Sequence, residues 1–247
     1  MRNCCLIVLL SLFLFVSCGE KRTNPLIQNL DQSWVVTTDT LDIKMQVDIP
    51  SVIQADMYEN GLIPHPYKSN VEPQLHWIPQ HEWTYTLDFE AEDYILNEDV
   101  VELVFEGLDT YADVWLNGKK LLHADNMFRT YSCDVKNIIK EKNNIKIKFY
   151  PFDKERDSLI ETYRLRFPEK YAVMRKAAYQ NGWDWAPRYM NMGIWQPVYL
   201  KAWTRSTICS ASVITNEIHE DKADLFFEAC IKADEEHSVR LQLFQEE

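Results

Sequence analysis

The sequence predicts an all-β protein, an antiparallel sandwich or jelly roll, and three observations support this prediction. Apolar and polar side chains alternate along several short segments, as they do in strands that bury one face. The dipeptide Asn117-Gly118, which favours the tight turn of a hairpin, separates two of these segments. No long amphipathic helix lies between them, which argues against the regular alternation of strands and helices in a parallel α/β fold.

The expected strands follow one another along the central part of the chain. Trp83, Tyr85, Leu87 and Phe89 alternate with polar residues, which places their side chains on one face of the first clear strand. Further strands are expected over Val101–Phe105, Ala112–Leu116, Lys119–Leu122, Ile145–Phe149 and Val198–Ala202. Residues Asp134 to Lys140 are expected to form a short helical turn, with Asp134 capping its amino end.

The chain changes character after Trp203. Ser206 to Ser212 is mostly small and polar, and strands are then expected over Ala223–Ile231 and Val239–Phe244, joined by an acidic turn. So few strands cannot close a sandwich of their own. We therefore expect a jelly-roll domain over residues 27–205 and, over residues 206–247, the truncated start of a second β domain.

Composition and charge narrow the class of protein. The 247 residues include 26 Lys and Arg against 38 Asp and Glu, for a net charge of −12, and 46% are hydrophobic, which is typical of a globular chain. The acidic balance argues against nucleic acid as a partner, because phosphate binding needs clustered cations. Aromatic residues make up 13% and include eight tryptophans, which is compatible with sugar binding and equally with core packing.

The first residues have the pattern of an export signal. Arg2 precedes an apolar run, Leu6–Val16, that is too short to span a membrane. Leu14 to Cys18 resembles a bacterial lipobox with Phe15 in place of the usual Leu, and an ordinary signal cut nearby is the alternative. We expect a lipoprotein signal peptide over residues 1–17, lipidation at Cys18 and a tether over residues 18–26. The product would be a secreted bacterial lipoprotein, anchored at a membrane in the periplasm or at the cell surface.

Cysteine and histidine spacing indicates neither a disulfide framework nor a metal site. Cys4 and Cys5 would leave with the signal, and the three cysteines that follow Cys18 are widely spaced: Cys133, Cys209 and Cys230. Buried free thiols are the expectation for them. None of the six histidines has a metal-ligand spacing to another histidine or to a cysteine. We therefore expect no metal and no cofactor.

Four stretches follow one another in the body of the chain, and any one alone would be weakly specific. They are Asn60-Gly61-Leu62-Ile63-Pro64-His65-Pro66-Tyr67, preceded by Pro50-Ser51-Val52 and followed by Trp77 and Glu82-Trp83; Phe105 to Gly118; Asp125-Asn126-Met127-Phe128-Arg129; and Arg175-Lys176-Ala177, Gly182-Trp183-Asp184-Trp185-Ala186-Pro187-Arg188 and Gly193 to Val198. Within the second, Gly107-Leu108-Asp109-Thr110 is interpreted as turn chemistry. Together and in this order, the stretches resemble the N-terminal part of a family 2 glycoside hydrolase of the β-mannosidase branch, with Ala186 where that branch often has Gly.

The resemblance implies a galactose-binding-like jelly roll followed by an immunoglobulin-like β domain and a catalytic (β/α)8 barrel. Retaining glycosidases use two carboxylates, which the family places on the barrel, and no alternating βα pattern occurs in this sequence. The chain would then be the N-terminal, non-catalytic portion of an exo-acting retaining β-mannosidase. Its ligand would be a β-mannoside or mannose-containing glycan, and its partner the missing barrel. The alternative is a stand-alone, membrane-anchored carbohydrate-binding module without catalysis.

Trp183-Asp184-Trp185 is the candidate site. A carboxylate between two large aromatics, beside Gly182 and Pro187, suits a loop that projects from the sheets. Aromatic faces can stack on a sugar, and a carboxylate accepts hydrogen bonds from hydroxyls. A structural role, with Asp184 bonded to the backbone, is the alternative. The resemblance implies that the Asp matching Asp184 enters the pocket for the terminal mannose, so Asp184 and, as a weaker candidate, Trp183 are expected to bind substrate.

Overall fold

The protein is a two-sheet β-sandwich that carries an additional hairpin. The computed structural model describes residues 25–164, 170–233, 236, 238 and 241. The expected signal peptide, Cys18 and nearly all of the tether lie outside the described residues, as does most of the strand expected over Val239–Phe244. None of the helices in the described part of the chain is both long enough and apolar enough to cross a membrane.

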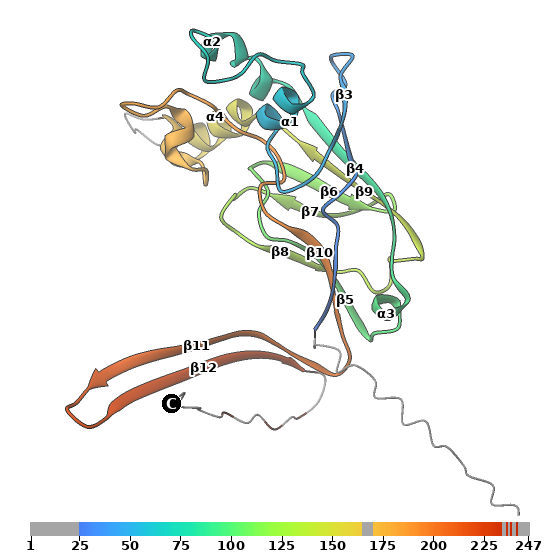
Figure 1. Cartoon of the computed structure of the whole chain (residues 1–247), viewed down its shortest axis with the longest axis vertical. Helices are drawn as coiled ribbons and strands as arrows, with labels where there is room; N and C mark the ends of the chain where they lie inside the picture. The colour runs from blue at the N-terminus through green and yellow to red at the C-terminus, as the bar shows by residue number, and fades with distance from the viewer. Residues whose placement is uncertain (1–24, 165–169, 234–235, 237, 239–240, 242–247) are drawn as a thin grey trace, which may run out of the picture.

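Two antiparallel sheets form the sandwich (Figure 1). The larger has the strand order β3-β2-β4-β9-β6-β7 and the smaller the order β1-β10-β5-β8. The bounds of the larger sheet are β2 (Trp34–Thr37), β3 (Lys44–Val47), β4 (Trp83–Glu90), β6 (Ala112–Leu116), β7 (Lys119–Ala124) and β9 (Lys142–Phe149). Those of the smaller are β1 (Leu26–Asn29), β5 (Val100–Phe105), β8 (Tyr131–Asp134) and β10 (Val198–Trp203). The expected antiparallel sandwich is confirmed.

The core lies between the two sheets because alternate side chains of each strand point inward. In β4, Trp83, Tyr85 and Leu87 are buried, while Thr84 and Thr86 between them lie at intermediate depth. Phe105 of β5 and Phe149 of β9 are also fully buried. The alternation seen in the sequence therefore marks the residues that hold the sheets together.

Of the two turns expected from the sequence, the structure confirms one and differs at the other. Asn117 and Gly118 both have positive φ, of 52° and 80°, and form the tight hairpin expected between β6 and β7. The helical turn expected after Asp134 is instead a non-helical turn. Asp134 nevertheless caps this turn as expected, because its Oδ1 accepts a hydrogen bond from the backbone N–H of Lys136 at 2.9 Å.

Short helices cover one end of the sandwich. Figure 1 shows α1 (Ile53–Glu59), α2 (Glu72–Leu75) and α4 (Phe152–Tyr163) at the end opposite the C-terminal hairpin. The twelve-residue helix α4 was not expected from the sequence. Only Phe152 of this helix is buried and most of its other residues are polar, so no apolar stripe announces it. The remaining helical segments are α3 (Asp93–Leu96), η1 (Ile78–Gln80), η2 (Lys170–Val173) and η3 (Ala178–Asn181).

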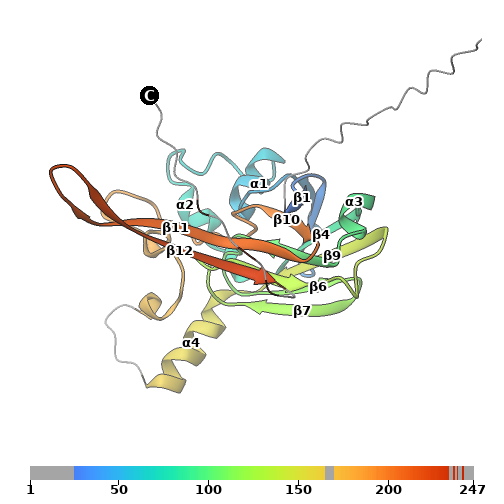
Figure 2. The ribbon, with the colours of Figure 1, turned by 90° about the horizontal axis from the view of Figure 1, so that it is seen from below.

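A long hairpin follows the sandwich. Strands β11 (Ser206–Ile218) and β12 (Ala223–Ala233) pair only with each other among the described residues, and Figure 2, the view from below, shows them crossing in front of the sandwich. The small and polar segment that begins at Ser206 is thus already strand, and the strand expected from Ala223 is confirmed. Apolar side chains of both strands, including Ile214 and Phe226, are about half exposed.

A buried carboxylate ties α1 to the larger sheet. Asp56 is 2% exposed, and it accepts hydrogen bonds from Ser51 Oγ and from the hydroxyl of Tyr85, the latter at 3.0 Å. Burial raises the pKa of Asp56 to about 6, although both hydrogen bonds oppose the shift. The folded state therefore binds this proton more tightly than the unfolded state does, and ionisation of Asp56 costs stability.

We predict that the chain becomes more stable as the pH falls from 7 to 5. The pKa of Asp56 is about 6 in the folded state and 3.8 in the unfolded state. The stability contributed by the protonated side chain is therefore complete below pH 3.8 and is lost as the pH rises through 6. The gain between pH 7 and pH 5 should be about 1 kcal/mol in urea unfolding. Asp56→Asn, which keeps the shape of the side chain, should remove this part of the pH dependence. An identical pH dependence in the two proteins would contradict the assignment.

Candidate functional site

The Trp-Asp-Trp motif forms a tight turn at the helical end of the sandwich. The backbone N–H of Trp183 donates to the carbonyl of Ala186 at 3.2 Å, and the N–H of Ala186 donates back to Trp183 at 3.3 Å. Asp184 and Trp185 are consequently the two residues at its tip. Gly182, whose φ of 99° suits glycine, ends η3 and turns the chain into this loop. The projecting loop expected from the sequence is therefore present.

The side chains of this turn face solvent. Trp183 is 57% exposed and Trp185 is 83% exposed, with their rings perpendicular and their centroids 6.2 Å apart. Asp184 is exposed, and within the described residues its carboxylate accepts no hydrogen bond. The structural alternative, in which Asp184 bonds to backbone, is thus not what the described chain shows. The exposure of Trp185 makes it a third candidate, which the same three-residue motif could have indicated.

A buried ion pair supports the segment that carries this turn. Lys176 and Asp109 have side chains only 1% exposed, and Lys176 Nζ donates to Asp109 Oδ1. Lys176 Nζ also donates to the carbonyl of Asn191 at 2.5 Å, and Gln180 Nε2 donates to Asp109 Oδ2 at 3.0 Å. Gln180 Oε1 in turn accepts from the N–H of Asn191 at 2.9 Å. These bonds hold both sides of the loop that presents Asp184.

The interpretation of Asp109 as a turn residue is therefore incomplete. Its carboxylate is a buried charge that joins two distant motifs, whereas a turn residue would be solvated. Burial lowers the pKa of Lys176, and the charge of Asp109 opposes that shift. The backbone completes the connection, because Asp109 and Gly193 exchange N–H···O bonds of 2.9 and 3.0 Å. A Cβ on Gly193 would lie 3.0 Å from both the Ser51 carbonyl and the Tyr85 hydroxyl, so the close packing requires glycine.

Arg188 fixes the far side of the loop. Its backbone N–H donates to Glu72 Oε1 at 2.9 Å, which connects the loop to α2. Its guanidinium donates to the hydroxyl of Tyr171 at 2.5 Å and lies over the ring of the same residue, 5.2 Å from the centroid. The loop is thus held by side chains from both α2 and η2.

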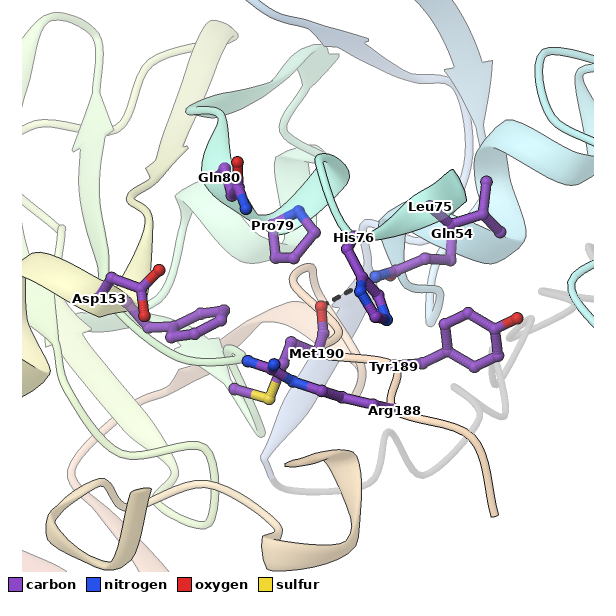
Figure 3. A pocket seen from close by; sticks show the side chains of 10 residues that line it. Gln54, Leu75, His76, Pro79, Gln80, Asp153, Arg188, Tyr189 and Met190 are labelled. Atoms are coloured by element: carbon purple, nitrogen blue, oxygen red, sulfur yellow. Dashed lines mark hydrogen bonds between the residues drawn. The ribbon is translucent and has the colours of Figure 1, made fainter. Parts of the chain in front are cut away.

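A small hollow lies beside Arg188, between the helices and the chain after the loop (Figure 3). Gln54 Nε2 donates to the carbonyl of Met190 at 2.8 Å, but Gln54 Oε1 is buried without a hydrogen-bond partner among the described residues. His76 Nε2 is likewise buried without a hydrogen-bond partner among the described residues, and Glu72 Oε1 lies 3.4 Å away. Sequence reasoning missed this hollow, because its residues come from segments far apart in the chain: Gln54, Leu75, His76, Pro79, Gln80, Phe152, Asp153, Arg188, Tyr189 and Met190.

The hairpin carries two further groups of reactive side chains. Glu217, His219 and Asp224 have their potential metal-ligating atoms within 4.8 Å of one another, and the 3.2 Å contact between His219 Nε2 and Asp224 already accounts for their proximity. Cys209 and Cys230 are exposed, so the expectation of buried thiols is wrong for both.

Comparison with known proteins places this sandwich in a defined class. The model of the glycosyl hydrolase 2 galactose-binding domain-like family matches residues 31–196, and the chain belongs to that family. The expected galactose-binding-like jelly roll is thereby confirmed.

The named relatives are β-mannosidases. Beta-mannosidase of Mus musculus is 28% identical over 188 residues, which are 71% of this chain and 21% of the relative. Beta-mannosidase A of Emericella nidulans is 31% identical over 182 residues, 69% of this chain and 19% of the relative. The crystal structure of beta-D-mannosidase from Dictyoglomus thermophilum superposes with a TM-score of 0.75 at 30% identity, covering 85% of this chain and 26% of that one. The chain thus spans about a fifth of the length of the curated relatives that it matches.

We predict that Lys176→Met destabilises the fold by about 3 kcal/mol, because it leaves the carboxylate of Asp109 buried without its cation. Urea unfolding should show a smaller loss in Lys176→Met/Asp109→Leu, where no charge remains. Lys142→Met is the matched control, since Lys142 and Glu90 form an exposed pair at 3.6 Å, and it should change stability by less than about 1 kcal/mol. Equal losses in Lys176→Met and Lys142→Met would refute a special role for the buried pair.

Proposed function

We propose that this chain is the N-terminal, non-catalytic portion of an exo-acting retaining β-mannosidase, an enzyme that removes terminal β-D-mannose residues. The observation that carries the proposal is the match to beta-D-mannosidase of Dictyoglomus thermophilum, in both sequence and fold, over most of this chain and a quarter of that one. The Mus musculus and Emericella nidulans relatives, both named as β-mannosidases, support the same assignment.

In this proposal the chain scaffolds a catalytic barrel and lends a loop to its sugar pocket. Retaining hydrolysis uses two carboxylates about 5–5.5 Å apart, which the barrel would supply. The turn of Trp183, Asp184 and Trp185 supports the proposal, because a carboxylate with no partner in the described chain is flanked there by exposed aromatic rings. Asp184 would accept hydrogen bonds from hydroxyls of the terminal mannose, and an aromatic ring would lie against the C–H face of a sugar.

The rigid support of the loop gives this role a physical basis. A group that orients a substrate contributes to catalysis only if it is held in place before the substrate arrives. The ion pair of Lys176 and Asp109 and the contacts of Arg188 hold the loop from both sides. The exposed apolar faces of β11 and β12 also favour further β structure packing on the hairpin, as an immunoglobulin-like second domain would.

We predict that Asp184→Asn in the complete enzyme lowers kcat/KM for a p-nitrophenyl β-D-mannoside by about 10- to 100-fold, the loss expected for one hydrogen bond to a charged group. Thermal unfolding should be unchanged, because the carboxylate has no partner in the described part of the fold. The matched control is Asp221→Asn, an exposed carboxylate at the hairpin turn, which should leave turnover intact. Unchanged kinetics in Asp184→Asn would remove this residue from the site.

The isolated chain distinguishes the proposal from a stand-alone carbohydrate-binding module. We predict that the chain alone neither hydrolyses a β-mannoside nor binds mannobiose strongly enough for calorimetry, because most of the pocket would belong to the barrel. Measurable binding would favour the module instead. The size of the native polypeptide, measured by immunoblot against the jelly roll, gives an independent answer. A band several-fold above 29.2 kDa supports the enzyme, and a band near 29.2 kDa contradicts it.

A further inference from the structure

The pairing of β11 with β12 brings two cysteines to the same place. Ile208 lies opposite Ile231, and Ser210 lies opposite Cys230, so Cys209 is an extra residue inserted between two paired positions. Such an insertion is a β-bulge, in which two successive residues of one strand oppose a single residue of the other. Cys209 therefore lies between the residues that pair with Ile231 and with Cys230, directly beside the partner of Cys230.

Cys230 also shares its face of the hairpin with Lys232. Cys230 and Lys232 are two residues apart on β12 and so point to the same side. The pKa of Lys232 is raised first by its hydrogen bond to Glu102, then by the charge of Glu102 and by the charges of both Cys209 and Cys230, so both thiols interact with the same ammonium group. Ser210 is directly opposed to Cys230, which gives a Cα separation of about 4.5–5.5 Å, and Cys209 is the neighbour of Ser210 on β11. A disulfide requires about 4.4–6.8 Å.

We propose that Cys209 and Cys230 are a disulfide-forming pair that links β11 to β12 at the bulge. The oxidant is an external disulfide of the glutathione type. One thiolate attacks that disulfide and forms a mixed disulfide with release of one glutathione thiol, and the second thiolate then displaces the other. Two protein thiols and one glutathione disulfide thus become one protein disulfide and two glutathione thiols. Both cysteines are exposed, so the oxidant can reach them.

The bond would fix the register of a hairpin that little else fixes. Within the described chain most side chains on both faces of β11 and β12 are exposed, and strands without a buried face specify their pairing weakly. A covalent link between Cys209 and Cys230 would keep the bulge at Cys209 and so prevent the two strands from shifting their register. Cys133 is the internal comparison, because it lies half-buried on β8 of the sandwich.

Peptide mapping after equilibration of the full chain with oxidised and reduced glutathione tests the proposal. Trypsin places the two cysteines in separate peptides, Ser206–Lys222 and Ala223–Lys232, with Cys133 in a third, Thr130–Lys136. We expect the first two peptides to appear joined, with the mass of two hydrogen atoms lost, at a glutathione potential that leaves the Cys133 peptide unlinked. Glutathione mixed disulfides at Cys209 and Cys230 in place of the joined peptides would overturn the proposal, as would links to Cys133.

A displaced thiol provides the matched control. In Cys209→Ser/Ser212→Cys the chain keeps the same number of cysteines, but residue 212 lies opposite Glu228, two residues away from Cys230. That spacing exceeds the reach of a disulfide without movement of the backbone. The variant should form mixed disulfides with glutathione in place of joined peptides. Equally efficient joining in the variant would show that the bulge geometry is irrelevant and would contradict the proposal.

Discussion

The ion pair between Lys176 and Asp109 is the interaction on which the arrangement of the candidate site depends. Burying two charges is costly, and it is tolerated here because their polar atoms have partners, including Gln180, Thr110 and the carbonyl of Asn191. The pair joins the turn after β5 to the segment between η2 and η3, which precedes the Trp-Asp-Trp loop, and Lys176 also bonds to Asn191, which follows the loop. The ion pair thereby anchors a loop that lies outside the sheets to the sandwich.

How far the sequence predicts this molecule depends on the range of the interaction involved. The strands were predictable because alternation is a local pattern, visible from Trp83 to Phe89 alone. Helix α4 was not, because its residues are mostly polar and only Phe152 is buried. The buried pair was not predictable either, since Asp109 and Lys176 are 67 residues apart and Asp109 sits in a motif that looks like a simple turn. The loop itself was predictable, because Gly182 and Pro187 punctuate the chain around Asp184.

The two ends of the sandwich differ in what they leave exposed. At the helical end, exposed aromatic rings and the carboxylate of Asp184, which has no partner among the described residues, are carried by a loop that the buried ion pair supports. At the opposite end, hairpin β11–β12 exposes apolar side chains over its length and is linked to β5 through Lys232 and Glu102. The exposed side chains at both ends would be covered if the sandwich lies between other parts of a larger enzyme, as we propose.

A crystal structure of the complete enzyme with a mannose-configured inhibitor would test the central claim most directly. We predict that a carboxylate oxygen of Asp184 lies within hydrogen-bond distance, about 2.6–3.2 Å, of a hydroxyl of the terminal sugar. We also predict that the loop keeps its conformation, held by Lys176 and Asp109. A sugar bound by the barrel alone, with Asp184 still exposed to solvent, would contradict the proposed role of this loop.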